Sequence, residues 1–305
     1  MFNEKRNNSG LMQDRKNKAI RCLVSCFAES QEVVRGIKAI KSLILMYKTI
    51  YIPTIIFNSE SWDNINKEEW QMLQVQQMKF LKRVLQVPTS TPNCLVLLEL
   101  GIVPIEMEIK SRQLNFLHSI LGLDEGDPVK KMFREQKKFP FESNWATEIG
   151  QTLRQLGLTE NEEEIREVSK ESWKKTVAER VRLLSLKNLN EERRNLKKGS
   201  GLKEYTEVEE QQYFEKLSAK DARTLFKIRT EMVDLKSHRR YKYEDLSCRL
   251  CNNGEENVDH VVNHCKEIPR FQTDTIDIYS EDVDIARNVV RRIRFFLDCV
   301  EMTNP

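Results

Sequence analysis

The chain is 305 residues long, with 39% hydrophobic residues, 32% charged residues and a formal net charge of +3. This length and composition predict a soluble globular protein with a sizeable core rather than a membrane-spanning chain. The net charge is too small to indicate a polyanionic partner, so any role with nucleic acid has to be argued from local charge. The chain has only 10 glycines and 8 prolines. Because strand-rich folds need frequent turns built on these residues, their scarcity predicts an all-α fold.

The start of the chain and its most apolar stretch predict neither secretion nor membrane insertion. Residues 1–6 are polar and lack the apolar region of a secretory signal. The apolar run 43–57 is interrupted by Lys48 and Pro53 and is too short to span a bilayer. We therefore expect an intracellular protein, in the cytoplasm or nucleus, with no membrane partner.

Helical periodicity dominates residues 1–122, which we predict to form a first helical unit. Apolar residues recur at helical spacing across 16–48, which indicates one helix or a helical pair. The segment 51–57 fits either a short extended piece or a further helical turn. Pro104 suits a first helical turn, and 105–121 carries the next amphipathic helix.

The clearest predicted helix covers residues 66–87. Asn66 followed by Glu69 predicts a capping box, in which each side chain satisfies a free backbone N–H of the first turn. Pro88 ends the helix, because the residue before a proline avoids helical backbone angles. The apolar face is expected to consist of Trp70, Leu73, Phe80, Leu81 and Val84. The cations expected to point away from that face are Lys79, Lys82 and Arg83.

Composition divides the rest of the chain into four parts. Residues 123–146 are polar with few apolar anchors and predict a linker. A second helical region is predicted over 147–235, with a flexible break at 197–201. A basic lead-in and a Cys/His cluster occupy 236–267, and a C-terminal helix follows within 268–305.

Helical spacing also defines helix starts and faces in the second half of the chain. Ser218 with Asp221 predicts a helix start, and the final helix is predicted over 282–301. One core-facing stripe consists of Trp173, Val177, Val181 and Leu184. On the helix that begins at Ser218, the cations expected opposite the apolar stripe are Lys220, Arg223 and Lys227.

One cluster has the spacing of a metal site: Cys248-x2-Cys251-x8-His260-x4-Cys265. Such clustering, without a secretory signal, favours metal binding over disulfides. Two cysteines separated by two residues can bind one ion from a tight turn, and three thiolates with an imidazole complete a tetrahedral zinc site. Because all four ligands come from the protein, the predicted zinc is structural. His264 is an alternative fourth ligand, since it follows His260 by four residues.

The segment before this cluster is both basic and aromatic. Its candidate nucleic-acid-binding residues are Lys236, Arg239, Arg240, Tyr241, Lys242 and Tyr243. Cations can pair with phosphates and tyrosines can stack on bases. The plainer alternative is a solvated connector. Next to a zinc knuckle we favour binding of RNA or DNA.

Catalytic motifs are missing from the sequence. It contains no glycine-rich phosphate loop, no G-x-S-x-G elbow and no pair of adjacent aspartates. Acidic runs such as 162–164 lie in charge-mixed helical surroundings and fit solvated faces. We therefore predict no catalytic residues.

The order of segments resembles the C-terminal part of the reverse transcriptase of non-LTR (LINE-type) retrotransposons. Residues 45–62 look like the passage that closes the reverse transcriptase domain, and 73–92 and 98–105 resemble the thumb of that family. The same family carries a Cys-Cys-His-Cys knuckle with very similar spacing, here at 248–265.

The resemblance implies a fragment of such a polyprotein. The family polymerises DNA with a pair of palm aspartates that this sequence lacks, so we expect nucleic-acid binding without catalysis by this chain. The expected partners are RNA or DNA, the remainder of the polyprotein, or a second copy of the chain. The alternative is a zinc-knuckle protein-interaction module of a truncated or host-adopted copy. If residues 1–58 abut a missing palm, the apolar side chains expected to be exposed are Ile52, Ile55, Ile56 and Phe57.

Overall fold

The computed structural model describes residues 9–29, 39–140, 143–196, 203–269 and 275–303. Within these ranges it contains helices and no β-strand, with only two isolated β-bridges. The predicted all-α class is therefore confirmed. The predicted break at 197–201 lies outside the described residues. No helix of the described ranges is both long enough and apolar enough to cross a bilayer.

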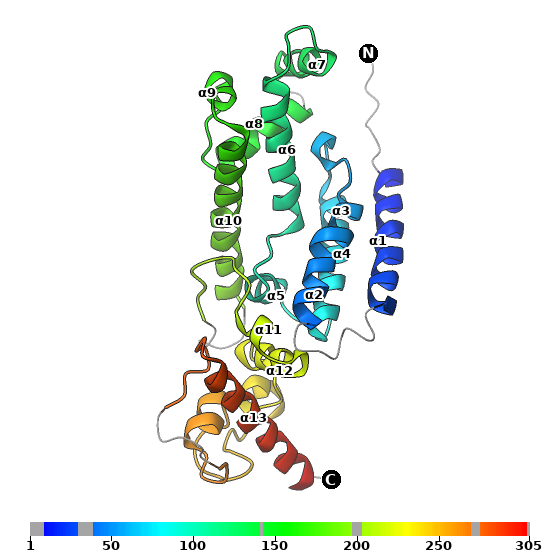
Figure 1. The fold of residues 1–305 in the computed structure, drawn as a ribbon. Helices are drawn as coiled ribbons and strands as arrows, with labels where there is room; N and C mark the ends of the chain where they lie inside the picture. Colours follow the sequence, from blue (N-terminus) through cyan, green and yellow to red (C-terminus); the bar gives the residue numbers. More distant parts are fainter. Residues whose placement is uncertain (1–8, 30–38, 141–142, 197–202, 270–274, 304–305) are drawn as a thin grey trace.

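In the first half of the chain, α1, α4 and α6 run roughly side by side (Figure 1). The elements of this half are α1 (Ser9–Glu29), α2 (Ala39–Met46), the π-helix η2 (Tyr47–Tyr51), α3 (Ile52–Ile55), the 3-10 helix η3 (Ser59–Ser61), α4 (Lys67–Leu85), α5 (Asn93–Glu99), α6 (Ile105–Leu121) and α7 (Pro128–Lys137). The later elements are α8 (Trp145–Gln155), α9 (Glu162–Glu167), α10 (Lys170–Arg194), α11 (Tyr213–Lys216), α12 (Ala219–Arg229), the 3-10 stretch η4 (Lys236–Lys242), the π-helix η5 (His260–His264) and α13 (Val283–Thr303). Helices α7, α8 and α9 lie at one end of α6 and α10, and α11, α12 and α13 lie at the other (Figure 1).

Helix α4 confirms the predicted capping box. The Asn66 side chain accepts a hydrogen bond from the backbone N–H of Glu69, and the Glu69 carboxylate accepts one from the backbone N–H of Asn66. The solvent-facing position predicted for Lys82 is wrong, because this side chain is buried. Its Nζ donates to the carbonyl of Thr89 at 2.6 Å, just beyond the helix end. The cation thus satisfies a carbonyl of the turn that follows the helix.

The undecided segment 51–57 is helical and buries most of its apolar side chains. Ile52, Ile55 and Ile56 lie in the core, which corrects the expectation that they are exposed. Helix α1 covers them, so the chain supplies its own partner for this face. Phe57 is 65% exposed, as expected, and the Arg15 guanidinium lies 5.6 Å from its ring.

The buried apolar residues form two separate cores, one toward each end of the molecule. The second core joins the far ends of α6 and α10 to α7, α8 and α9. It includes the predicted stripe residues Trp173, Val177 and Val181, with Leu184 packed against it. The segment 123–146, predicted as a linker, contains α7, whose Phe133 packs edge-on against Trp145 with ring centroids 5.9 Å apart. Two aromatic anchors therefore hold a stretch that reads as polar.

The first core is formed by residues of helices α1 through α5, of α11, α12 and α13, and of the Cys/His cluster. Helix α12 begins at the predicted Ser218 cap, whose Oγ accepts from the Asp221 backbone N–H. Arg223 is buried rather than opposite the apolar stripe, and its Nε donates to the carbonyl of Val84 at 2.9 Å. This bond ties α12 to the last turn of α4.

A return segment after α10 crosses the end of α5 and positions the C-terminal elements. Leu100 and Glu210 form an isolated antiparallel bridge, and Gly101 adopts a left-handed φ of +61° beside it. A Cβ on Gly101 would overlap the backbone of Glu209 and Glu210. The buried carboxylate of Glu99 accepts hydrogen bonds from Tyr205 and, at 2.6 Å, from Tyr213.

Candidate metal centre

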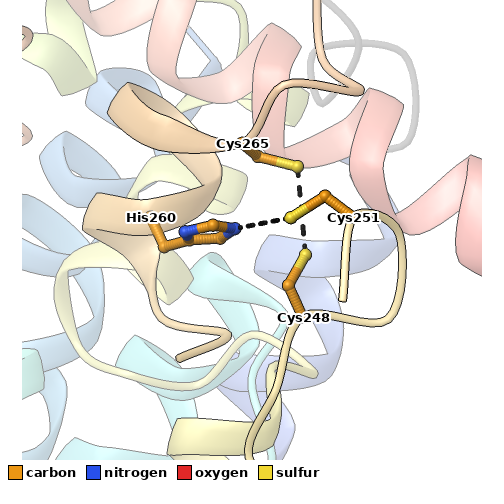
Figure 2. Close-up of side chains that lie close together, drawn as sticks. All are labelled: Cys248, Cys251, His260 and Cys265. Atoms are coloured by element: carbon orange, nitrogen blue, oxygen red, sulfur yellow. Dashed lines mark hydrogen bonds between the residues drawn. The ribbon is translucent and has the colours of Figure 1, made fainter. Parts of the chain in front are cut away.

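The structure brings the four predicted ligands together (Figure 2). The Sγ atoms of Cys248, Cys251 and Cys265 and a ring nitrogen of His260 all lie within 4.8 Å of one another. Cys248 Sγ is 3.9 Å from Cys265 Sγ, and Cys251 Sγ is 3.3 Å from His260 Nε2. These side chains can hold one metal ion. His264 lies outside the cluster, with its Nε2 3.2 Å from a carboxylate oxygen of Asp259.

The first two ligands come from a tight turn. The backbone N–H of Cys248 donates to the Gly254 carbonyl at 3.0 Å, and Asn252 N–H donates to the Cys248 carbonyl at 2.9 Å. Gly254 has a φ of +76°, and a Cβ there would lie 2.9 Å from Nδ1 of His260. Glycine is therefore required both by the backbone angle and by the close approach of the imidazole.

The other two ligands come from a π-helical turn. Residues 260–264 form η5, and the backbone N–H of Cys265 donates to the His260 carbonyl at 2.7 Å. In a regular α-helix, residues five apart point in different directions. The wider π turn brings them closer to one face, and such turns occur frequently at functional sites. Nothing in the sequence pattern predicts this turn.

Ionisation of the thiols depends on how deeply each is placed. Burial raises the pKa of Cys265 to about 12 and also raises the pKa of Cys248. Burial acts on Cys251 too, but hydrogen bonds from its own turn and the neighbouring thiols outweigh it and lower its pKa. Burial, with the neighbouring His264, lowers the pKa of His260 and so favours the neutral ring that a metal requires.

An ion pair between Arg249 and the buried Glu256 supports the turn that carries Cys248 and Cys251. Glu256 is 0% exposed, and its carboxylate accepts from the Arg249 Nε at 3.0 Å and a terminal Arg249 nitrogen at 2.6 Å. The same carboxylate accepts from the backbone N–H groups of Arg249 and Lys236 at 2.9 and 3.0 Å. Glu256 therefore fixes both the cysteine turn and the start of the basic lead-in.

The cluster is docked onto the C-terminal helix. Val261 and Val262 of the π turn are buried in the first core together with Ile293 and Phe296 of α13. The buried Arg292 of α13 donates to the carbonyl of Val262. The segment that carries the four side chains is thus part of the first core and not an independently packed module.

Most cations of the basic lead-in have carboxylate partners. Arg240 pairs with Glu255 at 2.6 Å, and Lys236 pairs with Asp245 at 3.2 Å. Arg239 Nε lies 3.8 Å from Asp234. Among the residues that the structure describes, Lys242 has no ion pair, and its Nζ lies 5.9 Å from the Tyr241 ring centroid.

The two tyrosines of the lead-in differ in exposure. Tyr241 is 76% exposed, so its ring is free to stack on another aromatic group. Tyr243 is half-buried, and the cationic groups of Lys236 and Arg249 lie 5.9 and 5.8 Å from its ring centroid. The exposed end of the lead-in is therefore Tyr241 with Lys242.

Sequence reasoning did not find the residues that support the ligands. These are the buried Glu256 and Arg292 and the half-buried Arg249, which connect the turn, the lead-in and α13. Glu256 and Arg249 lie among many charged residues, and only the fold shows that they face each other. The sole sequence signal is their position inside the ligand spacing.

Comparison with known proteins returns no family profile, no curated protein and no solved structure that matches this chain.

Proposed function

We propose that the chain is a zinc-stabilised, helical nucleic-acid-binding protein. The observation that carries the proposal is the convergence of three sulfurs and one imidazole nitrogen within 4.8 Å. For zinc–sulfur bonds of about 2.3 Å, the sulfurs of a tetrahedral site lie about 3.8 Å apart. The 3.9 Å separation of the Cys248 and Cys265 sulfurs agrees with that edge. Three thiolates and one imidazole are a donor set that suits zinc.

Zinc in this site has a structural role. Cys248, Cys251, His260 and Cys265 complete a four-coordinate shell, so zinc would hold the π turn against the cysteine turn without an open position for a substrate. The buried Glu256 lies between these two turns in the sequence. Its carboxylate accepts a hydrogen bond from the backbone N–H of Lys236 and so positions the start of the lead-in. Metal binding would thereby fix the place of the lead-in.

Support for a nucleic-acid partner comes from the exposed end of the lead-in. Tyr241 offers a ring on which a base can stack, and the unpaired ammonium group of Lys242 lies beside it to meet a phosphate. Stacking on an aromatic side chain contributes about 1–3 kcal/mol per base. This pair therefore gives a sequence-tolerant contact with single-stranded RNA or DNA.

A matched pair of variants tests the contact. Lys138 and Phe139 are another adjacent, exposed cation and aromatic residue, directly after α7, which lies at the opposite end of the molecule from α12 (Figure 1). Binding of labelled single-stranded RNA and DNA is measured by fluorescence anisotropy over a salt series. We expect Y241A/K242A to weaken binding about tenfold or more and K138A/F139A to leave it unchanged. Equal binding by the two variants would contradict the proposal.

The ion pairs of the lead-in favour a second candidate, a protein-interaction module. Arg239, Arg240 and Lys236 already face carboxylates, so their charges are partly compensated before any polyanion binds. In this alternative, zinc shapes a surface for a protein partner or for a second copy of the chain. Absence of any salt-dependent binding by the wild-type chain, together with a concentration-dependent dimer in sedimentation, would favour it.

We further propose that the chain is the C-terminal portion of a LINE-type reverse transcriptase and lacks its own catalytic activity. The support is the order of the segments at 45–62, 73–92, 98–105 and 248–265 in the sequence. The test is a primer-extension assay with magnesium, an RNA template and purified protein. Extension by this chain alone would refute the non-catalytic part of the proposal.

A further inference from the structure

Basic residues are distributed unevenly along the chain. Helix α10, Lys170–Arg194, contains eight basic and four acidic residues, while the whole 305-residue chain has a net charge of only +3. The lead-in and cluster at 236–267 contain six basic and six acidic residues. Three thiolates around one divalent cation would add a further negative charge there. Helix α10 is therefore a better candidate than the lead-in for the protein surface that binds the phosphates of a nucleic acid.

Most of the cations of α10 are exposed and uncompensated. Arg193 is buried, and Arg194 pairs with Glu204. The other six are exposed and form no ion pair or side-chain hydrogen bond with a residue that the structure describes: Lys170, Lys174, Lys175, Arg180, Arg182 and Lys187. This contrasts with the lead-in, where three of four cations have a carboxylate partner.

The two flanks of α10 differ in their surroundings. On one flank, Lys175 and Arg182 line a groove of about 370 Å³ between the helix and the return segment 206–209. Glu179, Glu207 and Glu209 line the same groove, so carboxylates outnumber cations there. This flank is therefore not a phosphate site.

The other flank carries Arg180 and Lys187. They are seven residues apart, which places them on the same side of the helix about two turns and 10.5 Å from each other. Leu183 lies between them along the helix, is 52% exposed and also lines the edge of the groove. Arg180 has no carboxylate three or four residues away in either direction, and Lys187 forms no ion pair with Glu191, four residues on. This flank combines uncompensated cations with an exposed apolar side chain.

Packing fixes the direction of this flank. Trp173, Val177 and Val181 bury the neighbouring side of α10 against the second core, and α10 packs on α5 and α6, so Arg180 and Lys187 lie at the edge of the buried face. In Figure 1, α10 runs along one edge of the molecule, from the end that holds α9 toward the end that holds α12. Arg180 and Lys187 are nevertheless exposed, on a helix whose neighbouring face is packed into the core.

Resting on the proposed function, we propose that the Arg180–Lys187 flank of α10 binds the phosphate backbone of the nucleic acid. The recognised chemistry is a row of phosphates without base-specific contacts, and Leu183 packs against a sugar or base between them. The exposed Tyr241 and Lys242 then supply a second, separate contact.

The experiment compares two pairs of charge-removing variants with the wild-type chain. R180Q/K187Q removes two cations seven residues apart on α10. K131Q/K138Q removes two exposed cations seven residues apart at α7, on another exposed surface. The logarithm of the association constant for a labelled single-stranded RNA is measured against the logarithm of the salt concentration. Circular dichroism and the thermal midpoint check that each variant is folded.

The expected results separate the two proposals. Each lost phosphate contact lowers the magnitude of the slope by about 0.7, so R180Q/K187Q is expected to lower it by about 1.4 and K131Q/K138Q to leave it unchanged. An unchanged slope in R180Q/K187Q, or an equal fall in both variants, would overturn the α10 site. Loss of binding in Y241A/K242A with an unchanged R180Q/K187Q slope would retain the proposed function alone. No binding by the wild-type chain would overturn both.

Discussion

Arg249 grips the buried carboxylate of Glu256 with its Nε and one terminal nitrogen, at 3.0 and 2.6 Å. The same guanidinium donates to the Asp234 carbonyl at 2.7 Å and lies 5.8 Å from the Phe296 ring centroid of α13. One side chain thus joins the cysteine turn, the lead-in and the last helix. The stability of the C-terminal end is therefore expected to depend on this pair.

Truncation of Arg249 tests that dependence. In R249A, the Glu256 carboxylate would stay buried without its cation, so we expect the free energy of unfolding to fall by about 3 kcal/mol in a urea titration. The matched control is R240A, which removes an exposed arginine that pairs with Glu255. Exposed pairs contribute little, and a loss below about 1 kcal/mol is expected. Similar losses in the two variants would show that the Glu256 pair has no special role.

Gly101 is the clearest single-atom test of the fold. G101A would place a Cβ into the backbone of Glu209 and Glu210 at a left-handed φ of +61°. We expect G101A to lower the free energy of unfolding by at least about 4 kcal/mol, or to prevent folding altogether. G126A adds a Cβ that meets nothing within 4 Å, and a change of about 0.5 kcal/mol or less is expected. Tolerance of G101A would mean that the return segment does not cross α5 here.

Removal of the metal is predicted to loosen α13 as well as the ligand segment. Val261 and Val262 share the first core with α13, and Arg292 donates to the Val262 carbonyl. After chelation, hydrogen exchange should become faster across 246–268 and 283–300. Helix α8, in the second core, should keep its protection. Unchanged exchange in α13 would show that the two elements are energetically independent.

Thiol alkylation distinguishes the ligand cysteines from a core cysteine. Cys94 is 2% exposed, and burial raises the pKa of its thiol to about 11. A raised pKa favours the protonated form in the folded state, so its stabilising effect is lost as the pH rises from about 9 to about 11. At pH 8 we expect iodoacetamide to leave Cys94 unlabelled with or without a chelator.

The ligands should behave differently in the same experiment. Chelation should make Cys248, Cys251 and Cys265 reactive, as mapped by mass spectrometry of tryptic peptides. Labelling of these three at the same rate before and after chelation would show that no metal protects them.

Features that depend on neighbouring residues could be predicted from the sequence, and features that depend on tertiary contacts could not. The capping box of Asn66 and Glu69 and the helix at 105–121 follow from neighbouring residues, and the structure contains both. Lys82 and Arg223 were wrongly placed on solvent faces. Lys82 folds back onto the Thr89 carbonyl of the turn after α4, and Arg223 reaches the Val84 carbonyl, which only the tertiary fold brings near. Ile52, Ile55 and Ile56 are covered by α1, which periodicity alone cannot place.

The candidate site shows the same division. The spacing was sufficient to predict that Cys248, Cys251, His260 and Cys265 converge, because a metal-binding turn allows only a few spacings. The ion pairs of the lead-in could not be predicted, since the carboxylate of Glu255 comes from the cysteine turn and depends on its fold. The uncompensated flank of α10 likewise becomes visible only when the partners of each cation are known.

The measurement that tests the central proposal most directly is the zinc content of the purified chain and two single variants, by inductively coupled plasma mass spectrometry. Cys265 lies in the cluster, whereas Cys299 lies on α13 outside it. We predict one zinc per chain in the wild-type protein and in C299S, and little zinc in C265S. A wild-type chain without zinc, or equal zinc in C265S and C299S, would contradict the proposed site.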